Sequence, residues 1–519
     1  METVVLDGRE TSIKDVVLVA RFGAAVDLAE DAAARMDASR AVVERCVHGS
    51  LVRYGITTGF GKFCDVVISP EDNARLQLNL VMSHAVGVGD PLPEEVIRAM
   101  MMLRANALAV GDSGIRLSTV VALVDMLNAG VVPVVPAKGS LGASGDLAPL
   151  SHIALALCGL GECFYRGVRV SSAGALSAAG LEPVELSAKE GLALINGTQC
   201  MTAIGALAAF DAWKLVRTAD VVAAMTMQAL RGITDAYDPR VHEARGQFGQ
   251  IECAAHLRAL LEGSLLTTRQ GEERVQDAYT IRCVPQIHGA SRDAIAYVYD
   301  VVGREVNAVT DNPLIFPNPE DPSGGDIISG GNFHGQPVAL AMDFLGIAAA
   351  ELASVSERRI ERLVNPALSN GLPAFLTREG GVNSGFMIVQ YSAAALVSEN
   401  KVLAHPASVD SIPSSANQED HVSMGTIAAR KARDIVGNAR SVLAMELLAA
   451  CQALDLSHGQ ELLSPPTKAV YNLLRSAVPT VDDDRVMYQD IATATTLIAD
   501  GAILRVAAEA LAESEDDED

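Results

Sequence analysis

The segment Lys138-Gly-Ser-Leu-Gly-Ala-Ser-Gly-Asp-Leu-Ala-Pro149 joins a glycine-rich backbone to the start of an apolar helix. Its three glycines lack the Cβ atoms that would hinder a tight backbone fold. Asp146 stands where the N-cap of the following helix is expected, so Ala143-Ser144-Gly145 would lie at the positive end of a helix dipole. Negative charge that develops beside the tripeptide would be stabilised there.

Taken alone, this tripeptide predicts only a turn, because three small residues in a row are common in loops. Six further segments change that interpretation. They are Tyr54-Gly-Ile-Thr-Thr-Gly-Phe-Gly61, Ser83-His84, Ile195-Asn-Gly-Thr-Gln199, Gln276-Asp-Ala-Tyr-Thr-Ile-Arg282, Gly331-Asn-Phe-His-Gly335 and Asn417-Gln-Glu-Asp-His-Val-Ser-Met424. In this order the segments resemble the motifs of the aromatic amino acid ammonia-lyase family, and the resemblance covers essentially the whole chain.

The resemblance implies that the chain forms its own prosthetic group, 4-methylidene-imidazole-5-one (MIO), and needs no external cofactor. In that chemistry the amide nitrogen of Gly145 attacks the carbonyl of Ala143. Two waters are lost, and the exocyclic methylene derives from Ser144. The residue types suit this step, since glycine offers an unhindered nitrogen and serine a hydroxyl that can be eliminated.

The same resemblance implies roles for the other motif residues. Tyr54 and Tyr279 are expected at the reacting atoms, and either could be the base. Arg282 is expected to bind the substrate carboxylate in a bidentate pair, and Asn196 to orient the ring or the substrate amine. The resemblance leaves open whether the amine or the imidazole ring of the substrate attacks the prosthetic group. Two weaker assignments are Gln276 and Phe333, which either contact the substrate or only pack.

Substrate choice is expected to depend on His84 and Glu419. In the family these positions resemble the pair that faces an imidazole side chain, and a carboxylate buried against a phenyl ring would be left unpaired. L-histidine is therefore the expected substrate, with urocanate and ammonia as products. The alternatives are a tyrosine or phenylalanine ammonia-lyase, an aminomutase, or an inactive helical assembly. Thr57 and Ala278 depart from the family's usual asparagine and proline, which puts loop rigidity in doubt.

Helical periodicity predicts a mainly α fold. The resemblance adds a central bundle of long near-parallel helices and a homotetramer with shared active sites, the architecture also found in fumarases. We expect a mixed amino-terminal domain over 1–200, a helical bundle over 201–512 and an acidic disordered tail over 513–519. Val168-Arg-Val-Ser171 predicts a strand, and Ser187 with Glu190 a capping box. The long helices are predicted over 27–48, 93–111, 118–128, 198–230, 292–309, 338–364, 387–403 and 423–454.

Composition bounds the remaining possibilities. The net charge of −24 disfavours nucleic acid and anionic membranes as partners, since phosphate repels an acidic surface. The eight cysteines are scattered without metal-ligand spacing, which predicts reduced core thiols and no metal. The start of the chain lacks a signal pattern and no membrane span is expected, so we predict a cytoplasmic protein. The acidic surface would also suit a salt-rich cytoplasm.

Overall fold

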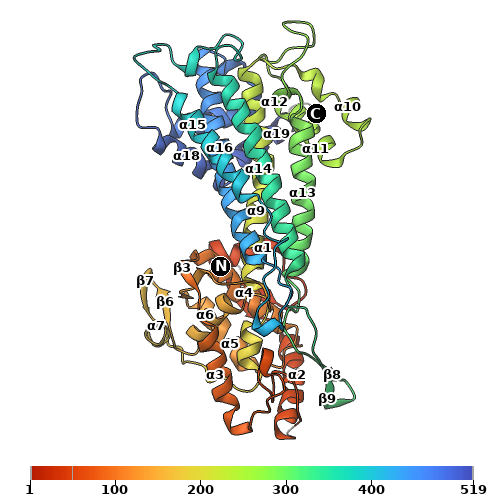
Figure 1. The fold of residues 1–519 in the computed structure, drawn as a ribbon. Helices are drawn as coiled ribbons and strands as arrows, with labels where there is room; N and C mark the ends of the chain where they lie inside the picture. Colours follow the sequence, from red (N-terminus) through yellow and green to blue (C-terminus); the bar gives the residue numbers. More distant parts are fainter. Residues whose placement is uncertain (1–2, 50, 517–519) are drawn as a thin grey trace. The chain divides into compact units, whose positions relative to one another are not determined.

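The computed structural model describes residues 3–49 and 51–516, and the chain forms two compact units (Figure 1). Unit 1 comprises residues 1–210, 299–343 and 406–430, and unit 2 comprises residues 211–298, 344–405 and 431–519. Each unit is assembled from separate stretches of sequence. The single domain boundary expected near residue 200 stays a prediction.

Unit 1 combines short helices with four small sheets. β1 pairs with β2 in parallel. The other pairs are antiparallel: β3 with β5, β8 with β9, and β6 with both β4 and β7. The predicted strand at Val168–Ser171 is β7. The strands are β1 (Thr3–Leu6), β2 (Ala25–Leu28), β3 (Val88–Pro91), β4 (Val131–Pro133), β5 (Pro136–Lys138), β6 (Glu162–Tyr165), β7 (Val168–Ser171), β8 (Leu314–Asn318) and β9 (Asp321–Ile328).

Two helices of unit 1 carry its main buried core. Helix α4 buries every residue from Ala99 to Ala109, most of which are apolar, and α1 packs along it. The helices that lie wholly in unit 1 are α1 (Ile13–Phe22), α2 (Glu30–His48), α3 (Asn73–His84), α4 (Glu94–Ala109), α5 (Leu117–Asn128), α6 (Leu147–Leu157), α7 (Ser172–Ala179) and α8 (Glu190–Ile195).

Unit 2 is almost entirely helical. Hydrogen bonds join four of its helices side by side: Thr226 of α9 and Arg359 of α14 both bind Glu446 of α16, and Ser291 of α13 donates to the Ala348 carbonyl of α14. The helices that contribute are α9 (Gln199–Ala229), α10 (Pro239–Glu243), α11 (Phe248–Leu261), α12 (Tyr279–Arg282), α13 (Val284–Glu305), α14 (Gln336–Val364), α15 (Met387–Leu403), α16 (Gly425–Leu456), α17 (Pro465–Ala477), α18 (Tyr488–Ala499) and α19 (Ala502–Asp516).

The mainly α fold predicted from the sequence is confirmed, and most predicted helices match observed ones within a few residues. α19 continues to Asp516, so residues 513–516 of the expected tail are helical, and residues 517–519 lie outside the described part of the chain. By length and composition α14 is the one described helix that could cross a membrane, but 67% of its most apolar window is buried inside the protein. Helices buried in a protein core also have this composition.

Two local predictions are confirmed only in part, because tertiary donors and acceptors compete with local ones. Asp146 is the N-cap residue of α6 as predicted, yet its carboxylate makes no cap bond to that helix and instead accepts from Ser140, Thr426 and the Met201 N–H. The predicted capping box at Ser187 forms only in half. Glu190 accepts from the Ser187 N–H at 2.7 Å, but its carboxylate also binds Arg116.

Candidate active site

A cavity of about 770 Å³ in unit 1 brings together five of the residues singled out from the sequence. Its lining includes Tyr54, His84, Ser144, Asn196 and Glu419. These side chains come from separate segments of the sequence, and all of them belong to unit 1. The remaining lining is largely apolar, with Phe60, Phe63, Leu76, Leu80, Leu147, Leu192 and Ile195 among its members.

The Ala143-Ser144-Gly145 segment is held by a close approach of two backbones. Gly145 has a φ of +73° and forms a bridge with Gly197, and a Cβ at Gly145 would lie 2.2 Å from the Gly197 carbonyl oxygen. The same carbonyl accepts a 2.6 Å hydrogen bond from the Asp146 N–H. Any side chain at position 145 would therefore be excluded by both conformation and space.

Asn196 stands at the junction of α8 and α9 and is only 3% exposed. Its Oδ1 atom has no hydrogen-bond partner, although buried amide oxygens are usually paired. Its backbone carbonyl accepts from the buried guanidinium of Arg104, which also donates to Gln199 Oε1 at 2.9 Å. Arg104 thus holds the backbone of Asn196, while the side-chain oxygen can accept a hydrogen bond in the cavity.

Glu419 is held by two serine hydroxyls. Ser144 Oγ donates to its Oε1 at 2.9 Å, and Ser414 Oγ donates to its Oε2 at 2.8 Å. Backbone bonds in both directions also join Ser414 to Glu419. The three residues between them that have positive φ angles, Ser415, Ala416 and Asn417, form a tight and strained loop.

The hydrogen bonds of His84 determine its tautomer. Nδ1 lies 2.8 Å from the Leu80 carbonyl, which can only accept, so Nδ1 carries the proton and Nε2 carries the lone pair. Burial lowers the pKa of His84, although the Leu80 carbonyl and the charge of Glu419 act in the opposite direction. The neutral ring therefore offers an acceptor at Nε2.

The electrostatic setting of Tyr54 favours its protonated form. Burial raises the pKa of the phenol above its ordinary value, and the charges of Glu419 and Asp311 add to this effect, while the Gly61 N–H bond opposes it. That N–H donates to the phenol oxygen at 3.3 Å. Tyr54 therefore keeps its proton, which it can share in a hydrogen bond, and requires a strong driving force to lose it.

A model of the family described as aromatic amino acid lyase matches residues 11–476 of the chain. The chain belongs to the aromatic amino acid lyase family. The histidine ammonia-lyase of Alkaliphilus oremlandii is 60% identical over 98% of this chain and 99% of its own length. That of Caldanaerobacter subterraneus is also 60% identical, over 98% of each chain.

Solved structures of this lyase family share the whole fold. The histidine ammonia-lyase of Trypanosoma cruzi is 45% identical with a TM-score of 0.91, covering 98% of this chain and 95% of that one. A tyrosine aminomutase from Streptomyces globisporus is 40% identical with a TM-score of 0.93, covering 98% of each chain. The predicted ammonia-lyase architecture is confirmed.

The other residues expected at the lyase site do not line this cavity. Gln276, Tyr279 and Arg282 belong to unit 2, where the Arg282 guanidinium lies 4.6 Å from the centre of the Tyr279 ring. Tyr279 is 68% exposed, and Arg282 Nε is buried without a partner. Phe333 lies in a turn of unit 1 and is half-buried. Their expected roles stay predictions.

Several residues that matter to the geometry were not singled out from the sequence. Ser414 is one, because its contact with Glu419 depends on the fold of a loop rather than on a motif. Lys189 is another: it is fully buried, and its Nζ lies 2.7 Å from Asp311 Oδ2, which is also buried. The carbonyl of Leu80, four residues before His84, was the one partner that helical spacing could have predicted.

Proposed function

We propose that the chain eliminates ammonia from L-histidine to give trans-urocanate, the first step of histidine degradation. The observation that carries the proposal is the identity of 60% over nearly the full length with histidine ammonia-lyases, together with a cavity that presents His84 and Glu419. Tyrosine aminomutase activity is the second candidate, because the solved structure of a tyrosine aminomutase matches the fold of this chain as closely as that of a histidine ammonia-lyase does.

The hydrogen-bonding pattern of the cavity favours histidine over the other aromatic amino acids. His84 Nε2 and the Glu419 carboxylate are both acceptors, and Glu419 is near enough for its charge to act on His84. A protonated imidazole offers two N–H donors, a phenol offers one O–H and a phenyl ring offers none. Tyrosine would leave one of these half-buried acceptors without a donor from the substrate and phenylalanine would leave both, which weakens binding.

The residues present also fit an MIO group derived from Ala143, Ser144 and Gly145. Gly145 has no space for a side chain, Ser144 Oγ faces a carboxylate, and Asn196 Oδ1 lacks a partner beside them. When formed, the group would supply the electrophile that activates the substrate for loss of ammonia. The family in general depends on this group, which supports the assignment.

The chain's own residues would then bind the substrate and move its protons. His84 and Glu419 would bind the imidazole, and the Asn196 oxygen would accept a bond from the substrate amine. The elimination removes a proton from the β-carbon and releases the amine as ammonia. Tyr54, whose phenol stays protonated, can donate a hydrogen bond to the substrate, and either Tyr54 or Tyr279 remains a candidate for the base.

We further propose a homotetramer in which Gln276, Tyr279 and Arg282 of one copy complete the cavity of another. The exposed position of Tyr279 and the unpaired Arg282 Nε support this arrangement. Unit 2 also exposes Tyr297, Phe344 and Ile347, large apolar side chains of the kind that subunit interfaces bury. We expect the tetramer in the cytoplasm, without nucleic acid or membrane partners.

The test is the ultraviolet absorbance of urocanate with L-histidine as substrate, with L-tyrosine and L-phenylalanine assayed in parallel. Glu419→Gln keeps the shape of the side chain and removes its charge, so kcat/KM for histidine should fall by about tenfold to a hundredfold. Turnover of tyrosine but not histidine would refute the substrate and retain the family. Unchanged histidine turnover in the variant would refute the role of Glu419.

A further inference from the structure

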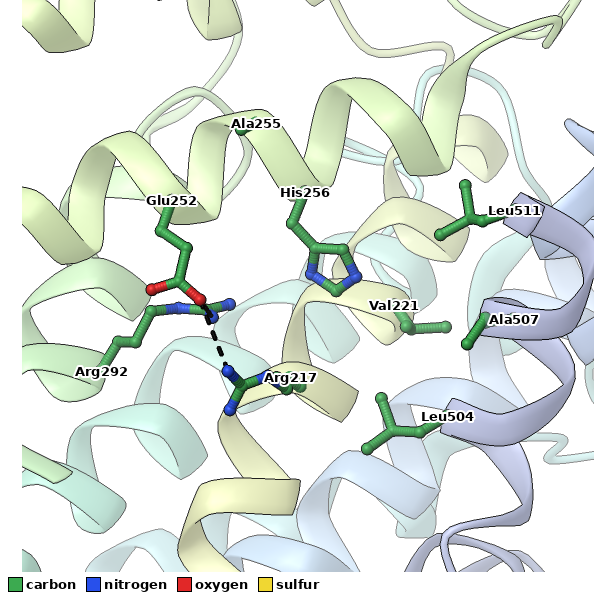
Figure 2. A pocket seen from close by; sticks show the side chains of 10 residues that line it. Arg217, Val221, Glu252, Ala255, His256, Arg292, Leu504, Ala507 and Leu511 are labelled. Atoms are coloured by element: carbon green, nitrogen blue, oxygen red, sulfur yellow. Dashed lines mark hydrogen bonds and ion pairs between the residues drawn. The ribbon is translucent and has the colours of Figure 1, made fainter. Parts of the chain in front are cut away.

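Unit 2 contains a second cavity, of about 450 Å³, that the proposed reaction does not use. It lies among α9, α11, α13 and α19 (Figure 2). Figure 2 shows charged side chains at one end and Leu504, Ala507 and Leu511 of α19 at the other, with the imidazole of His256 between them. The cavity is therefore polar at one end and apolar at the other.

Arg292 supplies a buried positive charge at the polar end. It is 3% exposed, and its guanidinium binds Asp220 and donates to Glu252 Oε1 at 2.6 Å. Its Nε atom has no partner. The arginine thus has more donors than the surrounding acceptors satisfy.

Arg217 adds a second positive charge that is only weakly paired. Its guanidinium stacks 3.9 Å from the centre of the Trp213 ring, and its ion pair with Glu252 is long, at 3.5 Å. Burial and the neighbouring charge of Arg292 lower the pKa of Arg217, while Glu252 and Asp220 oppose this effect. An anion bound nearby would relieve the repulsion between the two guanidinium groups.

His256 directs one nitrogen away from its protein partner. Nδ1 lies 2.9 Å from Asp220 Oδ2, and no described residue bonds to Nε2. Burial opposes ionisation of Asp220, but hydrogen bonds from His256 and His288 hold its pKa well below the usual range. The contact of Nδ1 with Asp220 fixes the orientation of the ring, which lies between the charged side chains and α19 (Figure 2).

A metal ion is a poorer occupant of this region. Asp220, Cys253 and His288 lie close enough together to share an ion. However, Asp220 Oδ1 already accepts from His288 Nδ1 at 2.7 Å and from Cys253 Sγ at 3.2 Å. The guanidinium groups of Arg292 and Arg359 contact the same cluster and would repel a cation.

We propose that this cavity binds a small organic carboxylate with an apolar body. The carboxylate would lie at the end formed by Arg217, Arg292 and His256, and the body would pack against Leu504 and Leu511. Glu252, whose side chain is 55% exposed, could turn toward solvent as the ligand carboxylate enters. The proposal does not depend on the reaction at the first cavity.

Binding can be measured with 4-fluorobenzoate as the probe, by fluorine NMR titration of the purified full-length protein. Arg217→Gln removes a charge, and Ala508→Trp narrows the cavity from an exposed position on α19. We expect each variant to weaken binding at least tenfold. Arg240→Gln is the matched control, since Arg240 is an exposed arginine of the same unit paired only with Asp238, and its affinity should match the wild type.

A crystal soaked with 4-bromobenzoate locates the ligand, because the bromine scatters anomalously. We expect the bromine beside Leu504 and Leu511. The proposal is overturned if the titration does not saturate, if both cavity variants bind as the wild type does, or if bromine is found only in the unit 1 cavity. A bromine peak without saturable binding in solution would also count against it. Melting curves confirm that the variants are folded.

Discussion

Replacing Ser414 by alanine should weaken catalysis without affecting formation of the prosthetic group. Glu419 accepts from two hydroxyls, Ser144 at 2.9 Å and Ser414 at 2.8 Å. Loss of water from Ser144 during ring formation would remove the first of these donors. Ser414 would then be the serine that still fixes the orientation of the carboxylate, so it is a positioning residue for Glu419.

The magnitude follows from the strength of that bond. A hydrogen bond to a charged group contributes about 1.5–3 kcal/mol, and 1.4 kcal/mol corresponds to a factor of ten. If the whole contribution is lost when the substrate binds, kcat/KM for histidine falls by about tenfold to a hundredfold. Ser414→Thr keeps a hydroxyl and should restore most of the activity.

Three measurements separate positioning from a general loss of structure. Urocanate formation gives kcat and KM, and intact mass shows whether the protein is two waters lighter than its sequence. Ser411→Ala is the control, because Ser411 Oγ accepts from the Val422 N–H in the same segment without contacting Glu419. The double variant Ser414→Ala with Glu419→Gln should be no worse than Glu419→Gln alone. The positioning role of Ser414 is refuted if the losses in kcat/KM of Ser414→Ala and Glu419→Gln add in the double variant. It is also refuted if Ser414→Ala is as active as Ser411→Ala.

Three further predictions concern the scaffold around the site. Gly145→Ala should leave the intact mass equal to that of the sequence, because a Cβ there would lie 2.2 Å from the Gly197 oxygen; a loss of two waters would contradict this. Lys189→Met should lower the free energy of unfolding by about 3–5 kcal/mol in urea titrations, because it leaves the buried Asp311 carboxylate without its partner. The double variant Lys189→Met with Asp311→Leu should recover much of that loss. If the losses of the two single variants add instead, the two charges are not coupled. Ala416→Gly should raise the melting temperature, since relieving a positive φ gives about 1 kcal/mol, and an unchanged temperature would show that the loop is not strained.

The periodic parts of the fold could be predicted because their cause is local. Helices such as α4 and α9 are long apolar or amphipathic segments, and their ends lie within a few residues of the predicted positions. The final helix, α19, was not among the predicted helices; it begins directly after Gly501, which has a φ of +73° and separates it from α18. A single glycine inside an apolar pattern does not by itself reveal a helix end.

The site was predictable only where its residues lie in motifs. Tyr54, His84, Ser144, Asn196 and Glu419 were each marked by a short segment, and all five line one cavity. Tyr279 and Arg282 were also marked by a motif, but they belong to unit 2 and do not line this cavity, so their roles stay predictions. Ser414 could not be found, since a lone serine in a loop carries no pattern.

The burial of several charged residues could not be predicted from the sequence. Lys189, Arg104 and Asp311 look like surface residues in an acidic chain, yet all three are buried. Burial lowers the pKa of Arg104 to about 10, although the charge of Asp311 opposes the shift. This cost is offset by three acceptors near the start of α9, namely the Ala193 and Asn196 carbonyls and Gln199 Oε1. The Gly197 carbonyl in the same turn accepts from the Asp146 N–H, so the network that holds Asn196 is joined directly to the Ala143-Ser144-Gly145 segment.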